Sequence, residues 1–485
     1  TWSLVGSEMC IRDRNNIELI FPEIFISLSI MFLLILGVFK KDSSKIIHNI
    51  SLLVLLITAV ITFNETLSIN PTTLFNESII IDYLSSFMKI ITLLAAFVVL
   101  LISSNYLRTF KIFKIEYPIL ILSSVLGMMI MISSNDLIVF YMGLELQSLA
   151  LYVLATFNRD QLKSSEAGLK YFVLSALSSG LLLYGCSLIY GFTGSTNFNV
   201  ISTQFNTNEY AITFGIVFIL VGLAFKISAV PFHMWAPDVY EGSPTSVTLF
   251  FTMVPKIAAL TVFIRFLYVP FLNLIDQWQM ILVFLSIASM LFGAIAAIGQ
   301  KNLKRLIAYS SISHIGYALA GLATGSNEGI QSSVIYMTIY IIMNLGFFSC
   351  LLMMKRNNIY YEQIDDLSGL SKNHPLLSIS LLIILFSLAG IPPLAGFFAK
   401  FYIFKSVIEQ SMYFLAIVGL LSTVVAAFYY LRIIKIMYFD EEKDSYDKDH
   451  NLWLKLSLTV STILILMYFI FPSELIDVVS KINII

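Results

Sequence analysis

Apolar segments about 20 residues long follow one another along almost the whole chain, which is the length that an α-helix needs to cross a bilayer. The composition agrees, because 58% of the 485 residues are hydrophobic and only 12% are charged. A soluble domain carries about 25% charged residues. The pattern predicts an all-α integral membrane protein with about fourteen transmembrane helices. The predicted helices lie near residues 17–39, 46–63, 79–103, 116–132, 136–157, 164–190, 211–231, 244–269, 276–299, 303–323, 328–354, 375–406, 412–438 and 452–471.

Little of the chain is left for a soluble domain or a metal centre. The longest polar connection, from Lys355 to His374, has about twenty residues, which is too few to fold alone. A net charge of -1 offers no basic face for nucleic acid. Cys10, Cys186 and Cys350 are scattered, so neither a disulfide framework nor a metal site is indicated.

We expect the chain to divide into five parts. Residues 1–16 are expected to be a non-native or disordered leader, because this stretch begins without Met, lacks hydrophobic periodicity and does not resemble a cleavable signal peptide. A three-helix segment, two five-helix units and a final loop with the last helix follow. Their expected bounds are 17–110, 111–271, 272–440 and 441–485.

Positive charge is confined to alternate loops. The loops at residues 64–78, 133–136, 191–210 and 324–329 contain no Lys or Arg. Basic loops remain on the cytoplasmic side of a membrane, so we expect the charged loops in the cytoplasm and both termini outside. The basic loop residues are Lys40, Lys41, Lys45, Arg108, Lys111, Lys114, Arg159, Lys163, Lys301, Lys304, Arg305, Lys355, Arg356, Lys372, Lys443 and Lys448.

Two predicted helices combine proline with a lysine. The seventh contains Lys226 before Pro231, and the twelfth contains Pro392 and Pro393 before Lys400. Proline removes a helical N–H and clashes with the preceding turn, so each helix must kink or break. The two breaks lie five helices apart and have opposite order along the chain. This spacing predicts two inverted five-helix repeats, helices 4–8 and 9–13, with helices 7 and 12 broken, as in many transporters.

Few ionisable side chains lie inside the predicted helices, and we interpret them as a set that moves a proton or another cation. They are Glu145, Lys226, Lys256, His314 and Lys400. A lysine in hydrocarbon costs about 2.5–3.5 kcal/mol on insertion scales. Burial favours the neutral form of a lysine and a nearby carboxylate favours the charged form. A lysine held between these influences can accept and release protons.

Structural roles are open for the same residues. Glu145 and Lys226 could form a static buried ion pair, and His314 could simply hydrogen-bond between helices. Lys170 lies near a helix start, from which its side chain could extend to the interface. Two groups of charged or polar residues complete the set. Asp82, Lys89 and Arg265 are expected at the interface, and His233, Asp238 and especially Glu241 could cap the following helix.

Five motifs along the chain carry a resemblance to a known family. In order they read GLELQSL from 143, EAGLKYF from 166, KISAVPFHMWAPDVYEGSPT from 226, YSSISHIGY from 309 and AGIPPLAGFFAKFY from 389. Together they resemble the antiporter-like membrane subunits of respiratory complex I, the bacterial NADH:quinone oxidoreductase. The resemblance covers essentially everything after Asn16. The paired Pro392-Pro393 is a departure, since the family has one proline and another residue there.

The resemblance implies a role for each buried charge. Glu145 in the fifth helix would pair with Lys226 in the seventh and modulate it. Lys256 in the eighth helix would connect the two halves. Lys400 in the twelfth would carry the proton on the exit side.

The resemblance also implies the setting in which the chain works. His314 and His233 would be possible relays in a hydrated central axis. No cofactor is expected in this chain, and NADH, FMN, iron–sulfur clusters and quinone would be bound by partner subunits. The expected partners are the antiporter-like subunit M, small membrane subunits such as K and J, and the lipid bilayer. The expected location is the bacterial inner membrane, with both termini periplasmic.

The function expected from this resemblance is that of a proton-translocating membrane-arm subunit, coupled to electron transfer from NADH to quinone elsewhere in the complex. The chain would thus belong to a translocase without performing redox chemistry itself. The alternative is a stand-alone Mrp-type cation/proton antiporter that uses the same lysines. A purely structural scaffold is disfavoured, because burying several charges costs free energy without improving packing.

Overall fold

The computed structural model describes residues 17–40, 43–65, 71–204, 209–447 and 451–485. The expected leader, residues 1–16, lies outside the described residues, as do Lys41 and Lys448.

The described chain is almost entirely helical. Its helices are η1 (Ile17–Ile20), α2 (Phe21–Phe39), α3 (Ser44–Glu65), α4 (Tyr83–Thr109), α5 (Glu116–Ile132), α6 (Leu137–Ala155), α7 (Leu162–Thr193), α8 (Phe198–Ile201), α9 (Glu209–Lys226), α10 (Trp235–Gly242), α11 (Thr245–Tyr268), η2 (Leu272–Leu274), α12 (Ile275–Ile298), α13 (Leu303–Leu322), α14 (Asn327–Met353), η3 (Ile364–Leu367), α15 (Leu370–Asn373), α16 (Pro375–Ala389), α17 (Ala395–Glu409), α18 (Tyr413–Phe439), α19 (Leu452–Met467) and α20 (Ser473–Val479). Two short antiparallel hairpins are formed by β1 (Thr72–Leu74) with β2 (Ile79–Ile81) and by β3 (Lys355–Arg356) with β4 (Ile359–Tyr360).

Each of the predicted transmembrane segments corresponds to a helix. Both breaks are confirmed: the seventh helix ends as α9 at Lys226 and is followed beyond its predicted end by the short helix α10, and the twelfth is divided into α16 and α17. Among the described residues, nine helices are long and apolar enough to span a membrane, and α5, most of α9, α16 and α19 form a shorter apolar group. Helix α13 belongs to neither group, because it carries several serines and a histidine, and nearly all of it is buried in protein.

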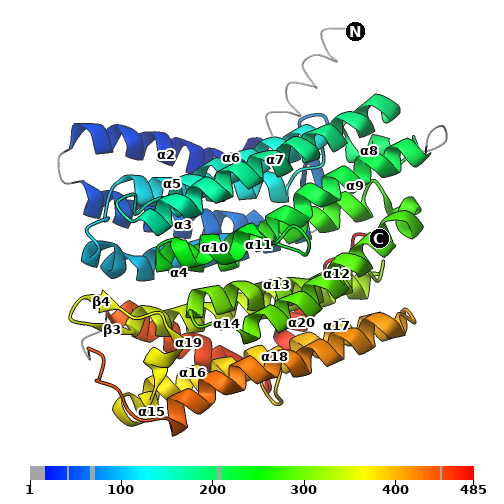
Figure 1. Ribbon diagram of the computed structural model, residues 1–485. Helices are drawn as coiled ribbons and strands as arrows, with labels where there is room; N and C mark the ends of the chain where they lie inside the picture. The colour runs from blue at the N-terminus through cyan, green and yellow to red at the C-terminus, as the bar shows by residue number, and fades with distance from the viewer. Residues whose placement is uncertain (1–16, 41–42, 66–70, 205–208, 448–450) are drawn as a thin grey trace.

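The long helices lie side by side in two bodies that meet near α11. Helices α2 to α11 form the upper part of Figure 1, and α12 to α19 the lower part. All residues of α11 are buried, and this helix packs against α4 and α5 on one side and α14 on the other. A span without lipid-facing positions can carry polar side chains, since neighbouring helices supply their partners.

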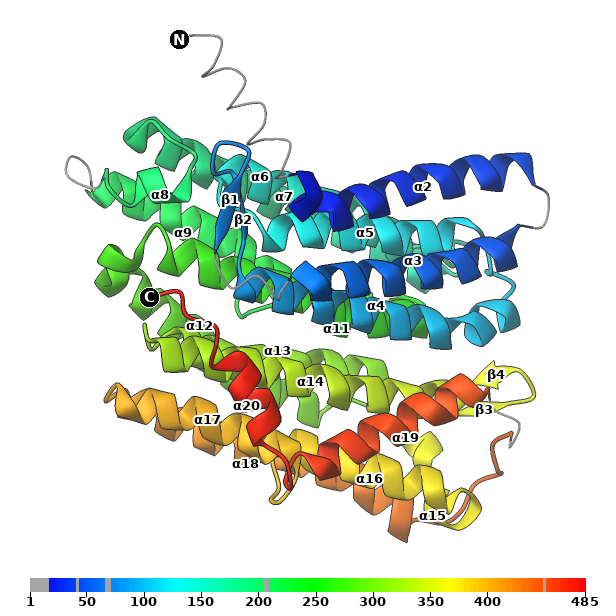
Figure 2. The same cartoon turned by 180° about the vertical axis from the view of Figure 1, so that it is seen from behind.

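The two described ends of the chain lie at the same end of the helix bundle. Near the start, Ile20 packs with Leu74 and Ile81 of the β1–β2 hairpin. At the other end of the chain, Ile485 and Asn483 are hydrogen-bonded to Asn327, at the start of α14. Figure 2 shows the β1–β2 hairpin and the C-terminus toward one end of the bundle and the β3–β4 hairpin at the other. The loops near both described ends are those without Lys or Arg.

Two of the residues expected at the interface, Lys89 and Arg265, are buried among the helices, and each is paired with a carboxylate. Lys89 forms an ion pair with Glu23 of α2, with 2.5 Å between Nζ and Oε1. Arg265 near the end of α11 forms an ion pair with Asp82 and donates a hydrogen bond to the Ile132 carbonyl. Each charge is buried with a carboxylate, which offsets the cost of removing it from water.

Asp82 itself is the N-cap of α4 and accepts a hydrogen bond from the Ser85 amide. Burial alone would raise the pKa of the Asp82 carboxyl, but the charge of Arg265, with hydrogen bonds from Arg265 and Ser85, holds this pKa below its usual range. The ionised cap therefore ties the start of α4 to α11.

Candidate functional site

The seventh span is broken next to Lys226, where α9 ends and α10 begins nine residues later at Trp235. The break leaves backbone groups that a continuous helix would pair, and side chains satisfy some of them. The Trp235 indole donates to the Phe225 carbonyl at 2.9 Å, and the Val230 amide donates to Ser289 Oγ at 2.9 Å. Irregular backbone at membrane depth is tolerated when protein groups pair it in this way.

The ammonium of Lys226 is buried and bound by hydroxyl groups. Its side chain lies between α6 and α7, and Nζ is 2.7 Å from both Ser148 Oγ and Ser175 Oγ. Tyr152 extends this cluster by donating to Ser175 Oγ at 2.6 Å. The residue is 7% exposed. Lys226 is therefore held by neutral oxygen atoms.

Glu145 and Lys226 do not form a direct ion pair in this structure, but the charge of Glu145 still acts on Lys226, so its modulation of the lysine stays a prediction. No ion pair of 4.0 Å or less joins them among the described residues, and Glu145 Oε1 is buried without a hydrogen-bond partner there. The physical reason is that Ser148 and Ser175 already occupy hydrogen-bonding positions around the ammonium. Glu145 and Ser148 are three residues apart on α6, so both side chains project from the same face of that helix.

Lys256 lies near the middle of α11, the fully buried helix, and is 1% exposed. Its Nζ donates to Ser311 Oγ of α13 at 2.8 Å and lies 5.7 Å from the centre of the Tyr240 ring. A single residue thus connects α11 of the first unit with α13 of the second. This position fits the role of connecting residue that the sequence predicted for Lys256.

Lys400 lies on α17 and turns back to the break that precedes that helix. Its Nζ donates to the carbonyls of Leu388 and Ala389 at 3.1 and 3.0 Å. These carbonyls are at the end of α16, where a helix has unpaired acceptors and a partial negative charge. The ammonium also lies 5.1 Å from the centre of the Tyr317 ring. The break thus supplies the binding groups for Lys400.

A face of α13 links the surroundings of Lys256 and Lys400. Ser311, His314 and Tyr317 follow one another at intervals of three residues, a spacing that aligns side chains along a helix. Ser311 binds Lys256, and Tyr317 lies beneath Lys400. His314 stands between them. We call Ser311, His314 and Tyr317 the α13 row.

His314 is buried in a cluster of hydroxyl groups. Its Nδ1 lies 2.5 Å from Tyr336 Oη, and its Nε2 lies 3.2 Å from Tyr430 Oη. Tyr430 Oη is in turn 2.5 Å from Ser310 Oγ. Since an imidazole and a phenol can each donate or accept, the cluster can accommodate a change in the direction of its hydrogen bonds.

His233 lies apart from this row. Its ring packs against Phe292, with 4.5 Å between ring centres, and its buried Nδ1 has no hydrogen-bond partner among the described residues. Among the described residues, no direct hydrogen bond joins His233 to His314 or to any of the three lysines, so its role as a relay in a hydrated axis stays a prediction.

Aromatic side chains fill the space between Lys226 and Lys256. Tyr152 is 5.0 Å from Tyr171, and Tyr171 is stacked on Trp235 at 4.5 Å. Trp235 lies 6.2 Å from Tyr240, whose ring faces Lys256. This connection differs from the α13 row, because rings rather than hydroxyl groups dominate it.

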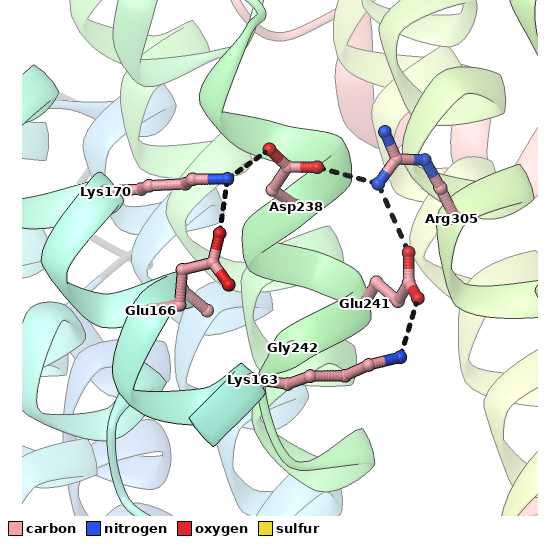
Figure 3. Close-up of a pocket in the computed structure, with 8 residues that line it drawn as sticks. Lys163, Glu166, Lys170, Asp238, Glu241, Gly242 and Arg305 are labelled. Carbon is pink, nitrogen blue, oxygen red and sulfur yellow. Dashed lines mark hydrogen bonds and ion pairs between the residues drawn. The ribbon is translucent and has the colours of Figure 1, made fainter. Parts of the chain in front are cut away.

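A second group of charges lies at the end of the bundle with the basic loops. Figure 3 shows Lys170 between Glu166 and Asp238, and Arg305 between Asp238 and Glu241. Lys163 also pairs with Glu241, at 3.3 Å. The residues come from α7, α10 and α13 and line a cavity of about 120 Å³. The expected capping role of Glu241 is wrong, because Pro244 is the N-cap of α11 and Glu241 forms ion pairs instead.

The residues that sequence reasoning missed are mostly neutral. They are the serines and tyrosines that bind the charged groups: Ser148, Ser175, Ser311, Tyr152, Tyr317, Tyr336 and Tyr430. The available signal was their helical spacing from a charge, as with Ser148 and Glu145, or Ser311 and His314. Contacts between helices carry no such local signal.

The chain is similar to known proteins both in sequence and in structure. A family model described as NADH:quinone oxidoreductase/Mrp antiporter, transmembrane, matches residues 134–426. A Pelagibacter ubique protein named NADH-quinone oxidoreductase subunit N is 77% identical over 471 residues, covering 97% of this chain and 100% of that protein. A Parvibaculum lavamentivorans protein of the same name is 50% identical, covering 94% of each chain.

Solved structures give the same architecture. A chain of respiratory complex I from Thermus thermophilus superposes with a TM-score of 0.82 at 28% identity, covering 95% of this chain and 100% of that one. A chain of the Mrp complex from Dietzia superposes with a TM-score of 0.84 at 21% identity, covering 95% and 96%, and this similarity shows the fold alone. The chain therefore belongs to the NADH:quinone oxidoreductase and Mrp antiporter family of membrane subunits, within the group named NADH-quinone oxidoreductase subunit N.

Proposed function

We propose that this chain translocates protons within the membrane arm of an NADH:quinone oxidoreductase, and that Lys226, Lys256 and Lys400 change protonation in turn. The observation that carries the proposal is that each ammonium is buried and bound by uncharged oxygen atoms. A carboxylate partner would stabilise the charged ammonium, so that removing its proton would cost a large amount of electrostatic free energy. A neutral partner leaves both protonation states accessible.

The hydroxyl partners suit both states of a lysine. A serine accepts a hydrogen bond from the ammonium, and can donate one to the amine after the proton has left. Ser148, Ser175 and Ser311 provide such groups around Lys226 and Lys256. The partners of Lys400 are carbonyls, which only accept, and both the ammonium and the neutral amine have enough N–H groups to donate to them.

Glu145 is proposed as a modulator of Lys226. Its carboxylate lies on α6 beside Ser148 but is not bonded to the lysine. Movement of the carboxylate toward the ammonium would stabilise the charged form, and withdrawal would favour release of the proton. A change of this kind is how an input from a partner could act on the first lysine.

The energy for pumping has to come from outside this chain. Moving one charge against 100 mV costs about 2.3 kcal/mol, and a passive path would only let protons flow downhill.

We propose that NADH, FMN, iron–sulfur clusters and quinone are bound by partner subunits, and that the chain contacts antiporter-like subunit M and small membrane subunits such as K and J. His314 would act within the α13 row, and His233 would be a possible relay outside that row.

The proposed location is the bacterial inner membrane, with the basic loops in the cytoplasm and the chain termini on the periplasmic side. This orientation follows from the distribution of Lys and Arg. It is supported by the packing of both described chain ends near loops that lack those residues. The Mrp-type alternative is less well supported, because relatives at 77% and 50% identity carry the NADH-quinone oxidoreductase name.

The test is proton pumping by the assembled enzyme in vesicles. Lys226→Ala should abolish pumping or reduce it strongly while the complex still assembles. Lys226→Arg supplies the matched variant, because arginine keeps the positive charge but does not give up its proton in proteins. A carrier role predicts that both variants fail. Full pumping with either variant in a fully assembled complex would contradict the proposal.

A further inference from the structure

A second cavity lies far from the lysine path, at the end of the bundle with the basic loops. It has a volume of about 480 Å³ and lies between the end of α14, the start of α16 and the first turns of α19. Asn373, His374 and Leu376 line it on one side, and Lys455 and Thr459 on the other. The volume falls in the usual range for small-molecule sites, about 300–1,000 Å³.

The polar part of this cavity is positive. Lys455 is exposed, and among the described residues it forms no ion pair. Among the described residues that line the cavity, none is acidic. Ser380 and Thr459 add hydroxyl groups, and the side chain of His374 accepts a hydrogen bond from the Tyr446 amide. The start of α16, a helix of 15 residues without a side-chain cap, adds partial positive charge.

The remaining wall is apolar and continues along the helices. Leu376 is 81% exposed at the start of α16, and Leu458 forms part of the wall on α19. Further along the same two helices, Ile379 and Ile463 are also exposed. The surface thus changes from cationic near the helix starts to apolar toward the membrane centre. That order matches a lipid molecule, which has a charged head and an apolar tail.

The geometry points to a binding site for an anionic phospholipid in this cavity. Its phosphate accepts hydrogen bonds from Lys455 and from the Ser380 hydroxyl, whereas the Thr459 hydroxyl donates to the Lys455 carbonyl; its acyl chains lie over Leu376 and along α16 and α19. The basic-loop side of a bacterial membrane protein faces the cytoplasmic leaflet, where anionic lipids bind basic pockets between helices. Free phosphate would leave the apolar wall exposed, and a neutral lipid would leave Lys455 without a counter-charge.

The experiment uses the assembled enzyme in nanodiscs of phosphatidylcholine that contain a small fraction of phosphatidylglycerol with a diazirine in its acyl chain. Light attaches the lipid to nearby residues, and mass spectrometry of the peptides locates the attachment. We expect labelling on α16 and α19 around the cavity. Lys455→Gln should reduce this labelling about fivefold, as expected for one lysine beside an anionic lipid.

Two variants provide the controls. Lys455→Arg keeps the charge and should retain the labelling. Lys435→Gln removes another exposed lysine, on α18, that does not line the cavity, and it should also leave the labelling unchanged. The inference is overturned if diazirine-bearing phosphatidylcholine labels the cavity equally, if Lys455→Gln has no effect, or if the label is absent because side chains of a neighbouring subunit fill the cavity. None of these outcomes depends on proton pumping.

Discussion

The buried lysines differ in the groups that bind them. Lys226 and Lys256 are bound by serine hydroxyls, which can serve either protonation state. Lys400 is bound by helix-terminal carbonyls, which favour the ammonium. If Lys400 carries a proton, as proposed, a change at the α16–α17 break would alter the carbonyls that bind its ammonium.

Glu145→Gln tests the role of the carboxylate. The change should lower proton pumping less than Lys226→Ala does, because Glu145 is not bonded to the ammonium and tunes its charge state from a distance. Pumping in vesicles containing equal amounts of assembled enzyme provides the measurement. An equal or greater loss with Glu145→Gln would exchange the proposed roles of the two residues.

Ser311→Ala tests the connection between Lys256 and the α13 row. The hydroxyl is the hydrogen-bond partner of Lys256, and a hydrogen bond to a charged group contributes about 1.5–3 kcal/mol. The variant should slow pumping about tenfold or more if the bond acts in the transfer step. The matched control is Ser349→Ala, which removes a buried hydroxyl paired with Ser457 away from the path. Equal rates in the two variants would argue against the connection.

Some residues of the candidate site could be predicted from the sequence, and others could not. The buried charges could be identified because a charge is rare in an apolar helix. The hydrogen-bond partners of these charges could not be identified, since nothing in the sequence distinguishes Ser175 and Ser311 from the many other serines in the helices. For the same reason the sequence could not show that two hydroxyls, rather than the Glu145 carboxylate, make the direct hydrogen bonds to Lys226, since that choice depends on distances of a few ångströms.

The broken helices are the elements that create the site. Their positions were predictable, because proline excludes a continuous helix at Pro231 and at Pro392. The contacts that form at each break were not predictable, because they depend on the path of the backbone. At the first break, Trp235 returns to bind the carbonyl of Phe225. At the second, Lys400 itself occupies the carbonyls at the end of α16.

Gly390→Ala tests the second break. Gly390 has a φ of +88°, which costs a residue with a side chain about 1–3 kcal/mol. An added Cβ would lie 3.0 Å from Lys400 Cδ and 3.2 Å from its Nζ. We expect reduced pumping, with little loss of assembled complex. Gly180→Ala on α7, where an added Cβ meets nothing within 4 Å, should leave pumping unchanged. Normal pumping with Gly390→Ala would show that this geometry is dispensable.

The whole molecule is arranged so that one buried helix separates two similar units. The number and order of the helices were predictable from length and hydropathy, even for α13, whose polar residues make it too hydrophilic for a lipid-facing span. Two buried ion pairs, Lys89 with Glu23 and Arg265 with Asp82, were not predictable, because each joins helices distant in the sequence. They anchor the first helices to the rest of the bundle.

The orientation can be tested with single cysteines. Asn76 lies in the β1–β2 hairpin and Asn357 in the β3–β4 hairpin, at opposite ends of the molecule. In intact cells a membrane-impermeant maleimide should label Asn76→Cys and not Asn357→Cys, and in inverted vesicles the preference should be reversed. Both variants carry Cys10→Ser, and the two remaining cysteines, Cys186 and Cys350, are buried and give a low background. Labelling of Asn357→Cys in intact cells would contradict the proposed topology and indicate the opposite orientation.

The most direct measurement of the central claim is the number of protons pumped per electron by the assembled enzyme carrying Lys256→Ala. Lys256 alone joins the two units through Ser311 in the proposed path. We expect a lower proton-to-electron ratio than in the unaltered enzyme. The control is Lys435→Ala, which changes an exposed lysine and should leave the ratio unchanged. An unchanged ratio with Lys256→Ala in fully assembled enzyme would contradict proton transfer through these lysines.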